Sequence, residues 1–82
     1  MSLKKQGYGS IAVAKTIGIS LRQLYYWVDV LHATAPLTHQ HGLRRFRRFS
    51  SQDLQRLKAI RGLTQQGYTL RAAIRIAKQR SR

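Results

Sequence analysis

The chain has 82 residues, of which 16 are Lys or Arg and two are acidic, so its formal net charge is +14 at pH 7. This length suits one domain with a small core, and a hydrophobic content of 43% is too high for a disordered basic tail. The lack of cysteine excludes disulfides and thiolate zinc sites. Because so basic a protein attracts polyanions, DNA, RNA and anionic lipid are the candidate partners.

Catalysis is not expected from the titratable residues. The two acids, Asp29 and Asp53, are far apart in the sequence and form no pair for acid–base chemistry, and no Gly-rich phosphate loop is present. Three histidines fall in one loop-like stretch, His32, His39 and His41, without acidic partners or helical spacing. We therefore expect exposed loop histidines, with no metal, no cofactor and no enzyme activity.

Residues 1–7 are expected to be a flexible basic lead, and residues 8–80 to form the domain. A first helix is predicted over 11–17, with Ser10 as its N-cap. Gly18 is expected to end this helix, because glycine readily adopts the left-handed conformation of a helix end. The buried face of the helix is predicted to hold Ile11, Ala14 and Ile17.

A second helix is predicted over 21–31, because Ser20 and Gln23 have the spacing of a capping box. Trp27 is expected in the core, as is Tyr8. The apolar stripe of this helix consists of Leu21, Leu24, Val28 and Leu31. The side chains outside the stripe are Arg22, Gln23, Tyr25, Tyr26 and Asp29.

The helical pattern breaks from residue 32 to residue 49, a stretch long enough to indicate a functional loop. Its last part, LRRFRRF, places arginine pairs between apolar residues and is compatible with a short hairpin arm that ends near Phe49. We expect Phe46 and Phe49 to pin this arm to the core rather than to stack on bases.

Two more helices are predicted after the arm. Ser50 and Asp53 form a second capping box, and Gly67 ends the third helix. Thr69 then caps the fourth helix, whose polar face carries Arg71, Arg75 and Lys78. The two buried stripes are Leu54, Leu57, Ile60 and Leu63, then Leu70, Ala73, Ile74 and Ala77.

The first two helices have the spacing of a helix-turn-helix, A-x3-G-x5-L, in Ala14, Gly18 and Leu24. Ala14 is small where two helices cross, Gly18 allows the tight turn, and Leu24 anchors the second helix. An ordinary helical hairpin with a glycine turn would show the same spacing. The outward residues Arg22 and Gln23 favour the first interpretation, because Arg and Gln read guanine and adenine edges in the major groove.

Residues 8–77 resemble the DNA-binding domain of MerR-type transcriptional regulators, a winged helix-turn-helix. The family opening is matched by IAVAK at 11–15 with Gly18, and the recognition-helix signature V-S-x-R-T-L-R-Y-Y/W-E by ISLRQLYYWV at 19–28. The wing signature G-Y-R-x-Y-S-x-x-D-L is matched by FRRFSSQDL at 46–54, and the helix and turn after it at 57–70. The arginine-rich string at Gly42 to Arg47 is equally similar to the excisionase-like branch of the superfamily.

Three positions depart from the family pattern. Tyr25 stands where the family has Arg, Val28 stands where it has Glu, and the glycine before the wing aromatic is displaced to Gly42. The operator sequence of the family therefore does not carry over. Family regulators continue into a dimerising helix and an effector-sensing region, so we expect this chain to be either a fragment of a longer regulator or a stand-alone short member.

The resemblance implies a mainly α fold, a four-helix winged helix-turn-helix with a short β-hairpin wing. It implies a MerR-like regulator that binds double-stranded DNA in the cytoplasm, associated with the nucleoid. We expect this chain to hold the DNA-binding domain without an effector domain. We expect no membrane contact, because no run approaches the ~18 apolar residues of a membrane span. An excisionase-like architectural protein and an RNA-binding protein are the alternatives. We expect dimerisation only on DNA or through a region outside this chain.

The second helix is expected to enter the major groove, with base contacts from Arg22, Gln23 and Tyr25. The resemblance implies that Tyr26 bonds phosphate. The arm is expected to lie on the DNA backbone or in the adjacent minor groove, where the negative potential favours arginine. The arm residues predicted to contact DNA are Arg44, Arg45, Arg47 and Arg48.

Overall fold

The computed structural model describes residues 7–80, but not the side chains of His39, His41, Arg44 and Arg45. Apart from Gly7, the expected basic lead therefore lies outside the described residues. The described elements are, in order, α1 (Ser10–Ile17), α2 (Leu21–Tyr25), the π-helix η2 (Tyr26–Val30), β1 (Leu37–His41), β2 (Arg44–Arg48), α3 (Ser51–Gln65) and α4 (Leu70–Arg80).

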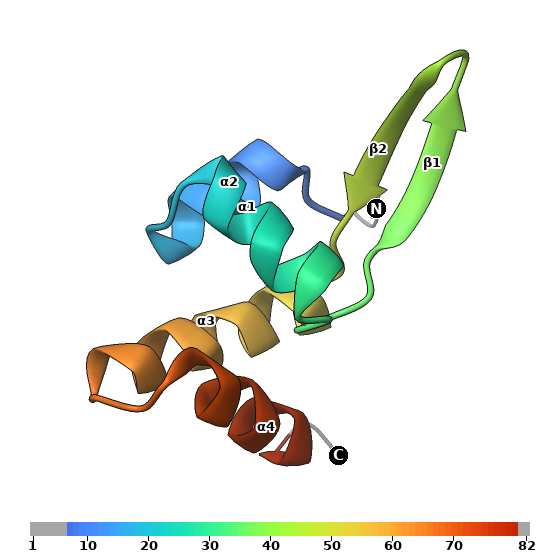
Figure 1. Ribbon diagram of the computed structural model, residues 1–82. Coiled ribbons are helices and arrows are strands. Elements are labelled where there is room, and N and C mark those ends of the chain that lie inside the picture. The colour runs from blue at the N-terminus through green and yellow to red at the C-terminus, as the bar shows by residue number, and fades with distance from the viewer. Residues whose placement is uncertain (1–6, 81–82) are drawn as a thin grey trace.

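Helices form the body of the molecule, and a two-stranded antiparallel hairpin projects from it (Figure 1). Helices α1 and α2 contact each other, α3 and α4 pack side by side, and α1 also touches α3 and β2. Because η2 continues α2, the described residues contain four helical segments and one hairpin. This is the mainly α winged helix-turn-helix predicted from the sequence. No helix within residues 7–80 is long and apolar enough to cross a membrane.

The turn between α1 and α2 depends on Gly18, as predicted. Gly18 has a φ of 81°, in the left-handed region, and its N–H donates to the carbonyl of Ala14 over 2.9 Å. The predicted start of α1 is wrong, because Gly9 is the N-cap and makes no side-chain cap bond. The predicted inward position of Ile11 is also wrong. Val13 is buried beside Ala14, which turns Ile11 outward to 64% exposure.

The second helix begins as predicted and then changes type. Ser20 and Gln23 form the capping box, with each side chain accepting the other's backbone N–H over 3.0 Å. From Tyr26 onward the turns widen, and the Leu31 N–H donates to the carbonyl of Tyr26, five residues back. The wider turn buries Trp27 and the adjacent Val28 together. A continuous α-helix over 21–31, as predicted, is therefore wrong in its second half.

The hairpin connection is two residues long. The strands pair from Leu37 opposite Arg48 to His41 opposite Arg44. Gly42 has a φ of 66°, which suits the first central position of a two-residue hairpin turn. The expected hairpin is confirmed, but the assignment of His39 and His41 to a loop is wrong, since both belong to β1.

Phe49, at the root of the hairpin, is fully buried and pins the arm to the core as predicted. Its backbone N–H and carbonyl both pair with Tyr8 over 2.8 Å. The same expectation is wrong for Phe46, which is 45% exposed, because residues three apart on an extended strand point to opposite faces. Tyr8 was expected in the core, yet it contributes its backbone while its side chain stays 42% exposed.

Helices α3 and α4 form an antiparallel pair with the predicted caps. The Ser50 hydroxyl accepts the Asp53 N–H over 3.0 Å, and Asp53 accepts the Ser50 N–H over 2.8 Å. The Thr69 hydroxyl accepts the Ala72 N–H over 3.1 Å. The buried apolar core of the described residues consists of Val13, Ala14, Ile17, Leu24, Trp27, Val28, Ala33, Phe49, Leu57, Ile60, Leu63, Ala73, Ile74 and Ala77.

Replacing Leu24 should destabilise the domain. Its side chain has no solvent exposure, and Leu→Ala changes at buried sites lower the free energy of unfolding by about 2–5 kcal/mol. Leu43→Ala is the matched control, because Leu43 lies at the hairpin tip with a fully exposed side chain. Thermal melting followed by circular dichroism should show a large fall in melting temperature for Leu24→Ala only. Equal falls for both variants would contradict the core described above.

Two Gly→Ala changes should alter the free energy of unfolding in opposite directions. Gly18→Ala should lower the free energy of unfolding by about 1–2 kcal/mol, because the left-handed conformation crowds a Cβ. Gly62 lies inside α3, and a Cβ there meets no atom within 4 Å. Gly62→Ala should therefore stabilise the domain by about 0.5–1 kcal/mol. Urea titration of both variants measures the pair.

Candidate nucleic-acid interface

The recognition helix, defined here as α2 together with η2, presents a polar face to solvent. Leu24 and Val28 fix its opposite face in the core. Arg22 is exposed at the start of this helix, and Tyr26 is 48% exposed one turn later. Their side chains are therefore available to a ligand that lies against the helix, as the sequence predicts.

Gln23 is exposed, but its side chain is already engaged. Its Oε1 accepts the Ser20 N–H in the capping box. Bidentate reading of an adenine edge uses both the oxygen and the nitrogen of the carboxamide. The cap that begins the helix therefore competes with the base contact expected of Gln23.

Tyr25 is half-buried beneath the hairpin instead of pointing freely outward. The Arg47 guanidinium lies over the Tyr25 ring, with its central carbon 4.5 Å from the ring centroid. Nη2 of Arg47 also donates to Asp29 Oδ2 over 2.6 Å. Three side chains, two from the recognition helix and one from β2, thus join the hairpin to the helix.

Of the two arm arginines whose side chains the structure describes, Arg47 differs more from the expectation than Arg48 does. Its side chain is only 28% exposed, and its charge already faces a carboxylate. The partner, Asp29, was not among the predicted site residues. Its position four residues after Tyr25 places both on one face of a helix. That spacing, together with the scarcity of acids, was the available signal in the sequence.

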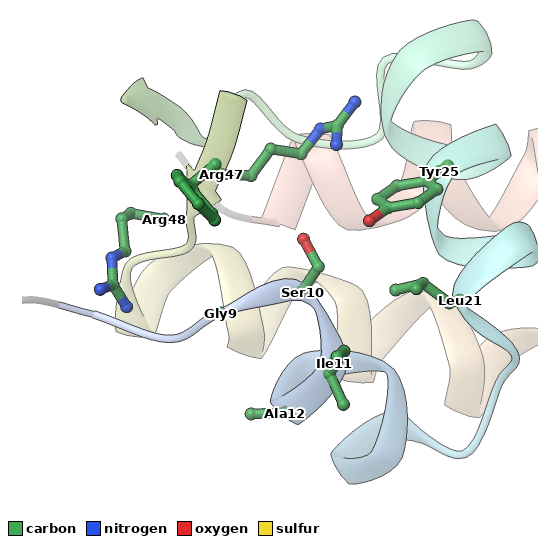
Figure 2. A pocket seen from close by; sticks show the side chains of 9 residues that line it. Gly9, Ser10, Ile11, Ala12, Leu21, Tyr25, Arg47 and Arg48 are labelled. Carbon is green, nitrogen blue, oxygen red and sulfur yellow. The ribbon is translucent and has the colours of Figure 1, made fainter. Parts of the chain in front are cut away.

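A cleft of about 470 Å³ lies between α1, the recognition helix and β2. In Figure 2 the hydroxyl groups of Ser10 and Tyr25 point toward this cleft, while the Arg48 side chain extends away from Tyr25. Arg48 is exposed. The lining residues are Gly9, Ser10, Ile11, Ala12, Leu21, Tyr25, Phe46, Arg47 and Arg48.

Arg44 and Arg45 belong to the backbone of β2, opposite His41 and Gln40. They lie on the arm as expected, and their side chains lie outside the described part of the chain. Arg47 lies two residues after Arg45 on β2 and pairs with Thr38. The arm therefore brings Arg47 and Arg48 to its root, beside the helices, and carries Arg44 to its tip.

A second basic surface lies at the carboxyl-terminal end of the recognition helix. Arg71, Arg75 and Lys78 of α4 line a cleft of about 470 Å³ together with Val30, Leu31, His32 and Ile74. The three cations follow one face of α4 at helical spacing. The sequence showed this face as polar, but the tertiary structure was needed to place it next to the end of the recognition helix.

Both carboxylate side chains of the chain have internal partners. Asp29 pairs with Arg47, and Asp53 accepts bonds from the Ser50 N–H and from the hydroxyl of the buried Thr34. Among the described residues, no three His, Asp or Glu side chains gather as a metal site. The surface therefore offers arginines to a ligand, while both acids take part in contacts within the protein.

Comparison with known proteins identifies the family. Residues 8–80 match the family model described as MerR HTH family regulatory protein. No curated protein and no solved structure matches the chain. The match covers the helix-turn-helix, the hairpin wing and the α3–α4 pair. This family consists of transcription regulators that bind double-stranded DNA through the helix-turn-helix, and the chain belongs to it.

Proposed function

We propose that this chain binds double-stranded DNA in a sequence-specific manner and acts as a MerR-like transcriptional regulator. The recognition helix enters the major groove, where Arg22 contacts base edges and Tyr26 bonds phosphate. The hairpin root on one side and α4 on the other lie against the two flanking backbones.

The observation that carries this proposal is the position of the cations around one exposed helix. Arg47 and Arg48 lie on its β2 side, and Arg71 and Arg75 lie on its α4 side. A reading element between two basic flanks suits duplex DNA, because phosphate contacts position a protein while base contacts specify the sequence. Single-stranded RNA is instead typically held on exposed aromatic platforms.

The charge balance supports the same partner. The net charge of +14 includes only two acids, and both already have internal partners. The exposed surface therefore carries few negative groups that would repel phosphate. The electrostatic field of the whole protein favours association with a polyanion. Sequence preference has to come from the recognition helix, since backbone contacts are common to all sequences.

Selection of bound duplexes from a random pool tests the proposal. We expect one enriched motif, and competition by single-stranded RNA should be weak. A palindromic motif supports a regulator that binds as a pair, whereas direct repeats support an architectural role. Binding without any enriched motif, or a preference for RNA, would contradict the proposal.

Binding should depend strongly on salt. If about six to eight phosphates are neutralised, log K should fall against log salt with a slope of about −5 to −7. Fluorescence anisotropy with the enriched duplex at a series of salt concentrations measures this slope. A slope shallower than about −2 would remove the electrostatic part of the proposal.

Arg22→Ala and Arg48→Ala should impair binding in different ways. Arg22 can pair bidentately with a guanine edge, so its loss should remove about 1–3 kcal/mol of discrimination at one base position. Arg48 is exposed on the arm. Its loss should weaken all sequences nearly equally and make the salt slope shallower by about one.

Affinities for single-base variants of the enriched duplex distinguish these two effects. Melting temperatures serve as the control, because both side chains are exposed and neither variant should unfold the domain. If Arg22→Ala weakened every sequence equally while Arg48→Ala changed the base preference, the roles of helix and arm would be reversed.

A further inference from the structure

Arg47 of the hairpin contacts two residues of the recognition helix, Asp29 and Tyr25, beside the proposed DNA surface. Asp29 Oδ2 lies 2.6 Å from an Arg47 Nη2, and the Arg47 guanidinium lies 4.5 Å from the centre of the Tyr25 ring. Asp29 is 47% exposed. The group thus lies at the surface, where a bound duplex would meet it.

A carboxylate at this place opposes DNA binding on charge alone. Asp29 is one of only two acids in the chain, and the other serves the α3 cap. It brings negative charge close to phosphates and also neutralises part of an arginine. Simple electrostatics therefore predicts that removing Asp29 would strengthen binding to every sequence.

The geometry assigns Asp29 a different effect. An arginine whose planar guanidinium is held by a carboxylate can press flat against an aromatic ring, and the two contacts define one orientation of all three groups. Held in this way, the Tyr25 ring and the root of the hairpin keep a fixed position relative to Arg22. Without Asp29, Arg47 gains freedom to leave Tyr25 and to follow phosphates.

We propose that Asp29 is a positioning residue for DNA recognition. By keeping Arg47 on Tyr25 it fixes the wing and the Tyr25 ring against the recognition helix, so it supports discrimination between sequences at the expense of raw affinity. This inference rests on the proposed function, because it concerns how the same surface distinguishes DNA sequences.

The test compares Asp29→Asn with Gln79→Lys in the full 82-residue chain. Both changes raise the net charge of the protein by one unit: the first removes a negative charge and the second adds a positive one. Gln79 is exposed near the end of α4. Figure 1 shows α4 and the hairpin at opposite ends of the molecule. Affinities are measured for the enriched duplex and for each of its single-base variants at one salt concentration, with thermal melting as a check on folding.

For Gln79→Lys we expect all affinities to rise together, with unchanged ratios between sequences. For Asp29→Asn we expect the ratio between the enriched duplex and variants at one or two base positions to fall about 3- to 10-fold, the range of an exposed ion pair and a cation–π contact. If Asp29→Asn instead strengthened all sequences alike, as the control does, the positioning role would be wrong.

Arg47→Lys separates charge from orientation. Lysine keeps the positive charge but has no planar guanidinium to lie on the ring or to pair with a carboxylate through a fork. We expect Arg47→Lys to lower the same sequence ratios as Asp29→Asn, and the double variant to show no further loss. Independent, additive losses would show that the two residues do not act as one unit.

A measurement without DNA distinguishes failure of this inference from failure of the proposed function. In the free protein, the ring current of Tyr25 should shift the NMR signals of the Arg47 side-chain protons upfield. We expect the shift to disappear in Tyr25→Leu and to shrink in Asp29→Asn. Absence of the shift in the wild-type chain would overturn the positioning contact, even if a motif is enriched. Presence of the shift without any enriched motif would overturn the proposed function, and the positioning role in recognition with it.

Discussion

The burial of Phe49 determines how the hairpin is attached to the helices. Its side chain has no solvent exposure, and its backbone pairs with Tyr8 through two hydrogen bonds of 2.8 Å. The next residue, Ser50, begins the capping box of α3. One residue thus joins the amino-terminal segment, the hairpin and the third helix. A Cβ at Gly7 would lie 2.5 Å from the Phe49 carbonyl oxygen, so this close approach also requires glycine on the opposite side.

The direction of the hairpin follows from this anchor. Because side chains alternate along a strand, the inward position of Phe49 turns Arg47, two residues earlier, toward the helices as well. Arg47 then reaches Tyr25 and Asp29. The arm is therefore held at two points, by apolar burial at its root and by a charged and aromatic contact beside it. A wing held in this way meets DNA in a defined orientation.

Much of the structure was predictable from local features of the sequence. Capping boxes need only residues three positions apart, so those at Ser20 and Ser50 could be recognised directly. Gly18 marked the turn for a similar reason, since its left-handed backbone is a property of the residue itself. The helix-turn-helix, the hairpin near Phe49 and the basic character of the surface followed. Local rules also conflicted at Gln23, which was assigned both a cap and a base contact although its Oε1 belongs to the cap.

The sequence by itself thus determined the starts of α2, α3 and α4, the turns, the family and the strong positive charge, because these depend on neighbouring residues or on composition. Only the tertiary structure decided which residues share the recognition surface. Asp29 and Arg47 are 18 residues apart, and nothing local indicates that they meet. The π-helical turn at Tyr26–Val30 and the position of α4 beside it are set by how Trp27, Val28 and Ile74 fit into one core. Such packing depends on the shapes of distant side chains, which no spacing along the chain specifies.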